Sequence, residues 1–202
     1  MVSASEAGGV TTLEIDSNGD GTPDASIDLA GTFPNGNFTV APDGTLSFVP
    51  ITAVDLTGTP GDDSLDGTYL SDTLSGLGGD DTLVGAGDAD TIDGGADDDL
   101  ISGGDGGDDL TGGSGNDTFS GTLAEFDGDV IADFQEGDVI DLTDVALTPE
   151  SVTVSIVGGV TTVAIDSDGD GIADASFQLT GSFEDGDITV GPDGYLRYEV
   201  PT

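Results

Sequence analysis

An aspartate recurs at every ninth residue through the middle of this sequence, between positions 58 and 120. Seven aspartates share this position: Asp63, Asp72, Asp81, Asp90, Asp99, Asp108 and Asp117. Carboxylates at a constant spacing suit a hard cation, because Ca²⁺ takes about six to eight oxygen ligands from carboxylates and backbone carbonyls. Ca²⁺ is favoured over Mg²⁺, since the sequence shows no rigid octahedral ligand set. The aspartates therefore predict a calcium-binding segment.

The residues around each aspartate keep the same period. Every nine-residue block begins with glycine, and its eighth residue is large and apolar: Leu65, Leu74, Leu83, Ile92, Ile101, Leu110 and Phe119. Gly and Asp tolerate left-handed backbone angles, so the first six residues predict a turn and the last three a short strand. A disordered Gly/Asp linker is the alternative, but such a linker has no reason to repeat an apolar residue at every ninth position.

Two blocks then form one coil of a flattened parallel spiral. Residues eighteen apart stack about 4.8 Å from one another. The aspartates fall into two columns, one of Asp63, Asp81, Asp99 and Asp117 and one of Asp72, Asp90 and Asp108. Stacked carboxylates repel one another unless a cation lies between them. The spiral is therefore expected to depend on bound ions.

The blocks GGSGNDTFS and GGDGGDDLT resemble the RTX (repeats-in-toxin) nonapeptide GGxGxDxUx. This resemblance implies a calcium-loaded parallel β-roll and type I secretion, which uses an uncleaved C-terminal signal. Leu70 departs from the family pattern because it replaces the fourth-position glycine of the second block. Asp88 and Asp97 replace the same glycine in two later blocks, a milder change because Asp tolerates the left-handed region.

The two flanks of the spiral repeat each other at a constant offset of 150 residues. Each flank carries a DxDxDGxxD-like loop between two predicted strands, with candidate ligands Asp16, Asn18, Asp20 and Asp24 in the first and Asp166, Asp168, Asp170 and Asp174 in the second. Alternate oxygen side chains before a glycine converge on calcium in loops of the EF-hand type. A plain Asp-Gly turn without metal is the alternative.

The predicted fold is all-β, with a central parallel β-roll of seven nonapeptide repeats between two homologous β-hairpin modules. Four parts are expected: a β module with a calcium loop (1–57), the roll (58–128), a capping segment (129–150) and a second β module (151–202). The capping segment resembles the end of RTX rolls in secreted metalloproteases, and Ile131, Phe134, Ile140 and Leu142 are expected to plug the roll. Residues Asp127, Asp129 and Asp133 are either ligands of a further cation or solvated carboxylates.

Composition narrows the function. The 202 residues include 42 acidic side chains and one basic side chain, giving a net charge of −41, with no His, Cys or Trp. Such a charge opposes compaction, and roughly seven or more bound calcium ions would offset part of it. Nucleic acid and anionic lipid are excluded as partners because both need Lys and Arg. The sequence contains no apolar run long enough to span a membrane and no classical N-terminal signal. Nothing in it indicates an enzyme.

Three functions fit these features. The leading hypothesis is a secreted calcium-binding structural protein of a surface or matrix, assembled head-to-tail from copies of itself, because the two flanking modules are near-copies. The second is an adhesin segment or a secretion and folding module of a larger exoprotein. The third is an ice-binding solenoid, which is disfavoured because the outward fifth position of the blocks is irregular. Calcium is scarce in the cytosol, so the expected location is outside the cell.

Overall fold

The computed structural model describes residues 2–7, 10–15, 25–30, 36–40, 46–50, 52–181, 183 and 187–198, and it is all-β with one short 3₁₀ helix at Pro149–Ser151. The chain forms two compact units, an N-terminal unit of residues 1–52 and a second unit of residues 53–202. None of the described helices is long and apolar enough to cross a membrane. The all-β prediction is confirmed.

The N-terminal unit contains a three-stranded antiparallel sheet and a separate hairpin. The sheet has the order β1 (Val2–Ala7), β2 (Val10–Ile15) and β3 (Ala25–Ala30). The hairpin pairs β4 (Gly36–Val40) with β5 (Leu46–Pro50). Within this unit β3 is therefore an edge strand, and β5 is paired on one side alone.

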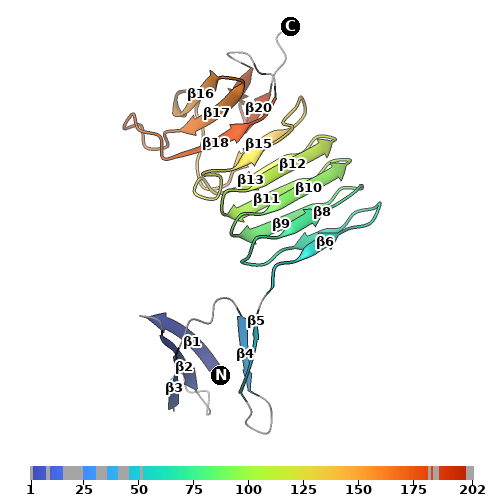
Figure 1. Ribbon diagram of the computed structural model, residues 1–202. Helices are drawn as coiled ribbons and strands as arrows, with labels where there is room; N and C mark the ends of the chain where they lie inside the picture. Colours follow the sequence, from blue (N-terminus) through green and yellow to red (C-terminus); the bar gives the residue numbers. More distant parts are fainter. Residues whose placement is uncertain are drawn as a thin grey trace. The chain divides into compact units, whose positions relative to one another are not determined.

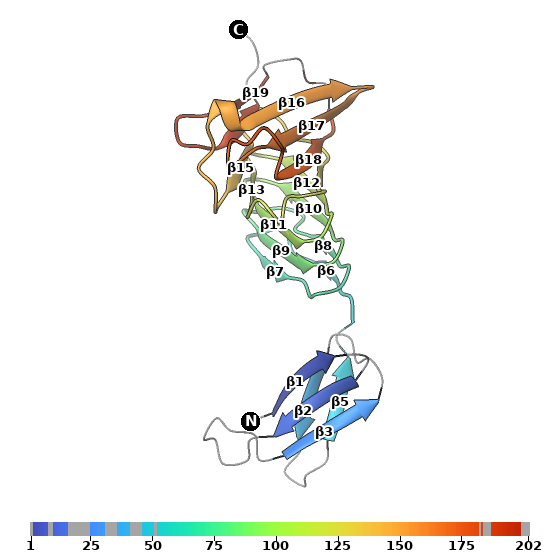
Figure 2. The same ribbon diagram turned by 90° about the vertical axis from the view of Figure 1, so that its left-hand side faces the viewer.

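The second unit is built on two facing parallel sheets (Figures 1 and 2). One sheet stacks β6 (Asp55–Thr57), β8 (Thr73–Ser75), β10 (Thr91–Ala96), β12 (Asp109–Ser114) and β14 (Val130–Ile131). The other stacks β7 (Ser64–Asp66), β9 (Thr82–Gly87), β11 (Leu100–Asp105), β13 (Thr118–Gly121) and β15 (Val139–Leu142). The chain alternates between the sheets, so each successive pair of strands is one coil. About five coils follow one another, which confirms the predicted parallel β-roll.

The apolar eighth residues form two ladders inside the roll. One ladder runs Leu56, Leu74, Ile92, Leu110, Ile131 and the other Leu65, Leu83, Ile101, Phe119, Ile140, each in direct register with the next. All of these side chains are buried except Leu56 and Leu65 in the first coil, which are half-buried. The apolar ladders are the core that the sequence period predicts, because alternate strand side chains point to the same face.

Strands β9 to β12 are longer than the three residues expected. In the pair β9–β11, for example, the ladder continues from Ser102↔Val84 to Gly104↔Ala86 and Asp105↔Gly87. The first residues of the following block therefore join the sheet before the turn begins.

The capping segment continues the roll as a fifth coil, although it was expected to act as a plug. Its strands β14 and β15 pair in parallel with β12 and β13, and Phe134 and Leu142 are buried beside them. Three extra residues enter between Phe119 and Ile131, so the offset to the preceding coil is 21 residues instead of 18. Phe134 packs against Phe119 with ring centroids 6.3 Å apart.

Residues after 151 extend both sheets of the roll. The strands β16 (Val152–Val157), β17 (Val160–Ile165) and β18 (Ala175–Leu179) form an antiparallel group whose β18 pairs in parallel with β14. On the other sheet, β20 (Leu196–Tyr198) pairs antiparallel with β15 and with β19 (Ile188–Val190). Leu179 and Leu196 lie in register with Ile131 and Ile140, so they end the two apolar ladders.

Candidate metal centre

The sixth-position aspartates line both edges of the roll in two columns. Five of the seven donate their backbone N–H to the Oδ1 of the aspartate eighteen residues later, as from Asp81 to Asp99 at 2.8 Å and from Asp90 to Asp108 at 2.8 Å. The same bond links Asp63 to Asp81, Asp72 to Asp90 and Asp99 to Asp117. The structure thus brings all seven predicted aspartates into the two predicted groupings.

Each column is longer by one aspartate than the nonapeptide blocks indicate. Asp108 donates its N–H to Asp129 at 2.9 Å, and Asp117 donates to Asp138 at 3.0 Å. Asp138 was not identified from the sequence, although a signal was present: Asp129 and Asp138 keep the nine-residue spacing after the three-residue insertion. At the opposite end, Val54 donates to Asp72 Oδ1 at 2.6 Å in place of an aspartate.

The second carboxylate oxygen of the central aspartates is buried and has no hydrogen-bond partner. This is the case for Oδ2 of Asp81, Asp90, Asp99, Asp108 and Asp117. A buried polar atom without a partner costs free energy, and a buried charge costs more. Five such atoms in a regular series indicate that the columns are suited to hold a ligand of opposite charge, a cation.

The turn around each of these oxygens is made of glycine backbone. A β-carbon placed on Gly76 would lie 2.1 Å from Asp81 Oδ2 and 2.5 Å from the carbonyl oxygen of Gly94. Gly85 and Gly94 are confined in the same way by Asp90 and Asp99. The first position therefore has to be glycine, because carboxylate and carbonyl oxygens occupy the space that a side chain would fill. The donors are oxygens alone, the set that Ca²⁺ prefers.

Burial raises the pKa of the column carboxyls from Asp90 onward in the absence of metal. The pKa rises to about 6 at Asp90, Asp99 and Asp138 and to about 7 at Asp129, in each case chiefly because burial disfavours the charged form. The charges of neighbouring column members raise it further, while backbone N–H donors act in the opposite direction. A bound divalent cation would favour the ionised form and reverse this effect.

The first coil differs from those above it. Here Oδ2 of Asp63 and of Asp72 accepts the backbone N–H of Thr59 and of Thr68, four residues earlier. In the next two turns, the residues at the second position, Leu77 and Ala86, take left-handed φ angles of 78° and 88°. The turns of the first coil therefore bind their own aspartate, whereas the later turns leave Oδ2 available for a metal.

The structure shows the backbone conformation of the three residues that replace the fourth-position glycine. Asp88 and Asp97 take the predicted left-handed angles, with φ of 59° and 75°. Leu70, which is among the described residues, does not take a positive φ. Its turn is closed instead by the Thr68 side chain, which accepts the Leu70 N–H at 3.2 Å.

A further row of acidic residues follows one edge of the roll and was missed in the sequence. Asp80 donates its N–H to Asp62 Oδ1 at 3.1 Å, Asp98 donates to Asp80 at 3.1 Å, and Asn116 donates to Asp98 at 2.8 Å. These residues are exposed and occupy the fifth position of alternate blocks. The signal appears only when every second block is compared, since the intervening blocks carry Ser, Ala and Gly there.

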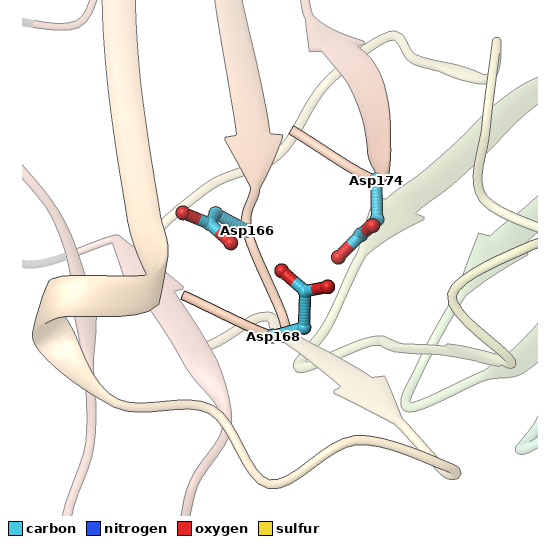
Figure 3. Close-up of side chains that lie close together, drawn as sticks. All are labelled: Asp166, Asp168 and Asp174. Carbon is cyan, nitrogen blue, oxygen red and sulfur yellow. The ribbon is translucent and has the colours of Figure 1, made fainter. Parts of the chain in front are cut away.

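The loop of the C-terminal module brings together three of its four predicted ligands. Carboxylate oxygens of Asp166, Asp168 and Asp174 lie within 4.8 Å of one another and point toward a common centre (Figure 3). Asp170 is not part of this group, and its Oδ1 accepts the Ile172 N–H at 2.8 Å. The equivalent residues Asp16, Asn18, Asp20 and Asp24 lie outside the described residues.

The loop carboxylates, unlike those of the columns, are satisfied by neighbouring donors. Asp166 accepts the N–H groups of Gly169 at 2.7 Å and Gly171 at 2.9 Å. Hydrogen bonds from the Ser167 hydroxyl and N–H lower the pKa of Asp174 below its ordinary value. The loop is therefore arranged for ionised carboxylates by its own backbone.

The three acidic residues that were expected to be either ligands of a further cation or solvated carboxylates have separate hydrogen-bond partners. Asp129 continues a column, Asp127 accepts the Ser176 N–H at 2.8 Å, and Asp133 accepts the N–H groups of Gly112 and Gly113 at 2.9 and 2.7 Å. Asp133 thus anchors the turn of the last nonapeptide block, and Asp127 joins the roll to the C-terminal module.

The family comparison agrees with this geometry. The model of the RTX calcium-binding nonapeptide repeat matches residues 57–92 and 84–119. Residues 57–119 are RTX repeats. The RTX repeats thus cover the coils in which the column aspartates carry unpartnered oxygens, and their Ca²⁺ chemistry is the one that the oxygen-only donor set fits.

Similar solved structures include two subunits of the mannuronan C5-epimerase of Azotobacter vinelandii. The AlgE6R3 subunit is 28% identical over 61% of this chain and 74% of that chain, with a TM-score of 0.32. The AlgE6R2 subunit is 28% identical over 65% of this chain and 85% of that chain, with a TM-score of 0.35. The search of curated proteins gives no match.

Proposed function

We propose that this chain is a secreted structural protein that folds on calcium and self-assembles into a filament or layer at a cell surface or in a matrix. The observation that carries the proposal is the series of five buried, unpartnered Oδ2 atoms in the roll. Ionised, these carboxylates oppose the packing of the coils, and Ca²⁺ between them turns that opposition into cohesion. Extracellular calcium suits this chemistry, which supports a location outside the cell.

Self-assembly is supported by the end of the sheets formed by β16 and β19. Strand β16 is an edge strand with the sequence VTVSIV, and Val157 is 75% exposed. A groove of about 290 Å³ at this end is lined by Pro149, Val152, Val154, Ile188, Thr189 and Val190. An apolar edge strand favours pairing with another chain.

Assembly is tested by light scattering and negative-stain electron microscopy of the full chain. We expect filaments or sheets in calcium that disperse on addition of EGTA, with magnesium unable to replace calcium. A protein that stays strictly monomeric at high concentration in calcium would contradict the assembly. A calcium-independent circular dichroism spectrum would contradict the calcium-dependent fold.

A second candidate is a calcium-folded adhesin segment or folding module of a larger exoprotein. The repetition of the flanking modules at an offset of 150 residues supports it, because tandem arrays show such repeats. In this case the calcium-dependent fold is retained, but the isolated chain remains monomeric.

A further inference from the structure

The two ends of the described chain have the same backbone plan. The pairing of β1 with β2, Val2↔Ile15, is repeated 150 residues later as Val152↔Ile165 in β16 and β17. The pairing of β2 with β3 is repeated in β17 and β18, and Val40↔Leu46 of the first hairpin returns as Val190↔Leu196. The strand arrangement of the N-terminal unit is therefore a copy of the one in residues 151–202, the C-terminal module.

The C-terminal copy shows what this arrangement is for. Its β18 adds to β14 through backbone hydrogen bonds that include Gly128 N–H to Ser176 O at 2.9 Å, Gln178 N–H to Asp129 O at 2.8 Å and Thr180 N–H to Ile131 O at 2.9 Å. Its Phe177 ring packs on Phe126 at 5.5 Å between centroids. The module thus closes the last coil of the roll and is a cap for that end.

The N-terminal copy repeats the elements that make this contact. Leu29 and Leu46 stand where Leu179 and Leu196 end the apolar ladders, and the apolar Ile27 replaces Phe177. Asp28 pairs with Thr12 as Gln178 pairs with Thr162, so its N–H points away from β2, toward the outer edge of β3. No described strand pairs with that edge or with the outer side of β5.

We infer that the N-terminal unit is a second cap, which docks on the β14–β15 end of the roll in another copy of this chain when the C-terminal module of that copy has left this end. The inference deepens the proposed self-assembly and rests on it in one respect, because calcium must fold the roll before its end can be capped. Docking adds β3 to β14 and β5 to β15, a strand addition in which backbone bonds supply affinity. The N-terminal copy has Asp28 and Ser47 in place of Gln178 and Arg197, so we expect it to bind more weakly than the C-terminal cap.

The test needs a roll whose own cap has been released. In the full chain, the substitution Gln178→Pro removes the N–H that bonds to Asp129 but spares β17, because that N–H points toward β14. Adding Asp28→Pro disables the N-terminal cap of the same molecule, so this open-roll double variant should be monomeric alone. Mixed with the unaltered chain in calcium, it is expected to form a complex with the mass of two chains in sedimentation velocity.

The matched control replaces the unaltered chain by the single variant Asp28→Pro, which keeps its own roll capped. We expect no complex in this mixture. Absence of a complex with the unaltered chain, or an equal complex with Asp28→Pro, would overturn the inference. Should Gln178→Pro remove the calcium-dependent dichroism of the roll, Thr180→Pro takes its place, since it removes the bonds to Ile131 O and Ala132 O but leaves those of Gly128 and Gln178.

These outcomes are separable from those of the proposed function. Filament formation is measured on the unaltered chain alone, whereas capping is measured in the mixture at concentrations where each protein is monomeric. Capping without filaments would leave the inference standing and contradict the assembly. Filaments without Asp28-dependent capping would support the assembly and contradict the capping inference.

Discussion

The roll and the hairpin loop of the C-terminal module both gather carboxylates, but they do so under opposite conditions. In the columns, Asp99, Asp108 and Asp117 are buried, one oxygen of each has no partner, and burial raises the pKa of each. In the loop, Asp168 and Asp174 are exposed, and the pKa of Asp174 is lowered by Ser167. A buried site of this kind needs the ion in order to fold, whereas an exposed loop can form first and bind afterwards. We therefore expect a metal ion to be coupled to folding in the roll and only to local order in the loop.

Removal of calcium should have the largest effect, and it should act on the roll. At pH 7.5 without calcium, we expect the roll to lose most of its β signal in far-UV circular dichroism, because its buried carboxylates would be ionised without a counter-ion. The measurement is a calcium titration of the dialysed chain, with magnesium as control. A spectrum unchanged by EGTA would contradict the role given to the columns.

Acid should replace calcium in the roll. The pKa in the folded state is about 6 for Asp90 and about 7 for Asp129, against an ordinary value of 3.8. A carboxyl whose pKa is raised in the folded state binds its proton more tightly there than in the unfolded chain. Its contribution to stability is complete at pH values below the ordinary pKa of 3.8, and it is lost as the pH rises through about 6 to 7. We expect the calcium-free chain to recover β structure near pH 4 and to lose it toward pH 8, followed by circular dichroism. Greater order at pH 8 than at pH 4 would refute this sign.

A matched pair of substitutions compares the two sites directly. In saturating calcium, Asp99→Asn should lower the free energy of unfolding by about 2 kcal/mol, because a buried charged ligand and its bonds are lost. At the half-buried Asp166, whose carboxylate is bonded by Gly169 and Gly171, Asp166→Asn should cost about 0.5 kcal/mol. Denaturant unfolding of both variants in calcium provides the measurement. Equal losses would mean that the two sites contribute alike to folding.

Glycine replacements test how closely the roll packs its turns. Gly104 has φ of 97°, and a β-carbon there would lie 2.4 Å from the carbonyl oxygen of Ala86. Gly158 has φ of 64° with no atom within 4 Å of the same position. We expect Gly104→Ala to cost about 2 kcal/mol or more and Gly158→Ala about 1 kcal/mol in denaturant unfolding. A larger loss for Gly158→Ala would contradict the tight stacking.

The smallest effect is a gain. Leu77 is half-exposed at φ of 78°, so Leu77→Gly should relieve backbone strain and raise the free energy of unfolding by about 0.5 kcal/mol, after the entropy cost of glycine. Leu70→Gly restores the family motif but relieves no described left-handed angle, so it should give no gain. Thermal unfolding in calcium ranks the two variants, and the opposite ranking would favour the motif over the observed backbone.

Strict periodicity explains why so much of the roll was predictable. A constant offset of 18 residues fixes both the register of the apolar ladders and the pairing of Asp81 with Asp99, without knowledge of any distant contact. The conformation of the turn in which Leu70 replaces the motif glycine could not be predicted in this way. A motif gives the usual residue at a position, but it does not show that the Thr68 side chain closes this turn. Asp138 was missed because the insertion after Phe119 hides the period from a fixed window.

The C-terminal module was recognisable as a repeat, but its attachment was not. Strand addition of β18 to β14 depends on backbone groups, which leave no residue-specific trace in a sequence. The separation of Asp170 from the other loop carboxylates could not be predicted either, because Asp168 and Asp170 both accept the N–H two residues later and differ only in the path of the loop backbone.

The hydrogen bonds that the column carboxylates accept from Val54 and from the column aspartates all run in one direction. Each of these N–H groups reaches the carboxylate of the coil that follows it, from Val54 at one end to Asp129 and Asp138 at the other. The main-chain carbonyl groups of the same aspartates accept from the opposite direction, as Asp72 O accepts the Thr91 N–H at 3.0 Å. Each coil is therefore bonded to both of its neighbours, but its carboxylate acceptors come from the C-terminal one. On this ground we expect ordering to travel from the capped fifth coil toward the N-terminus, opposite to the direction in which the chain is synthesised.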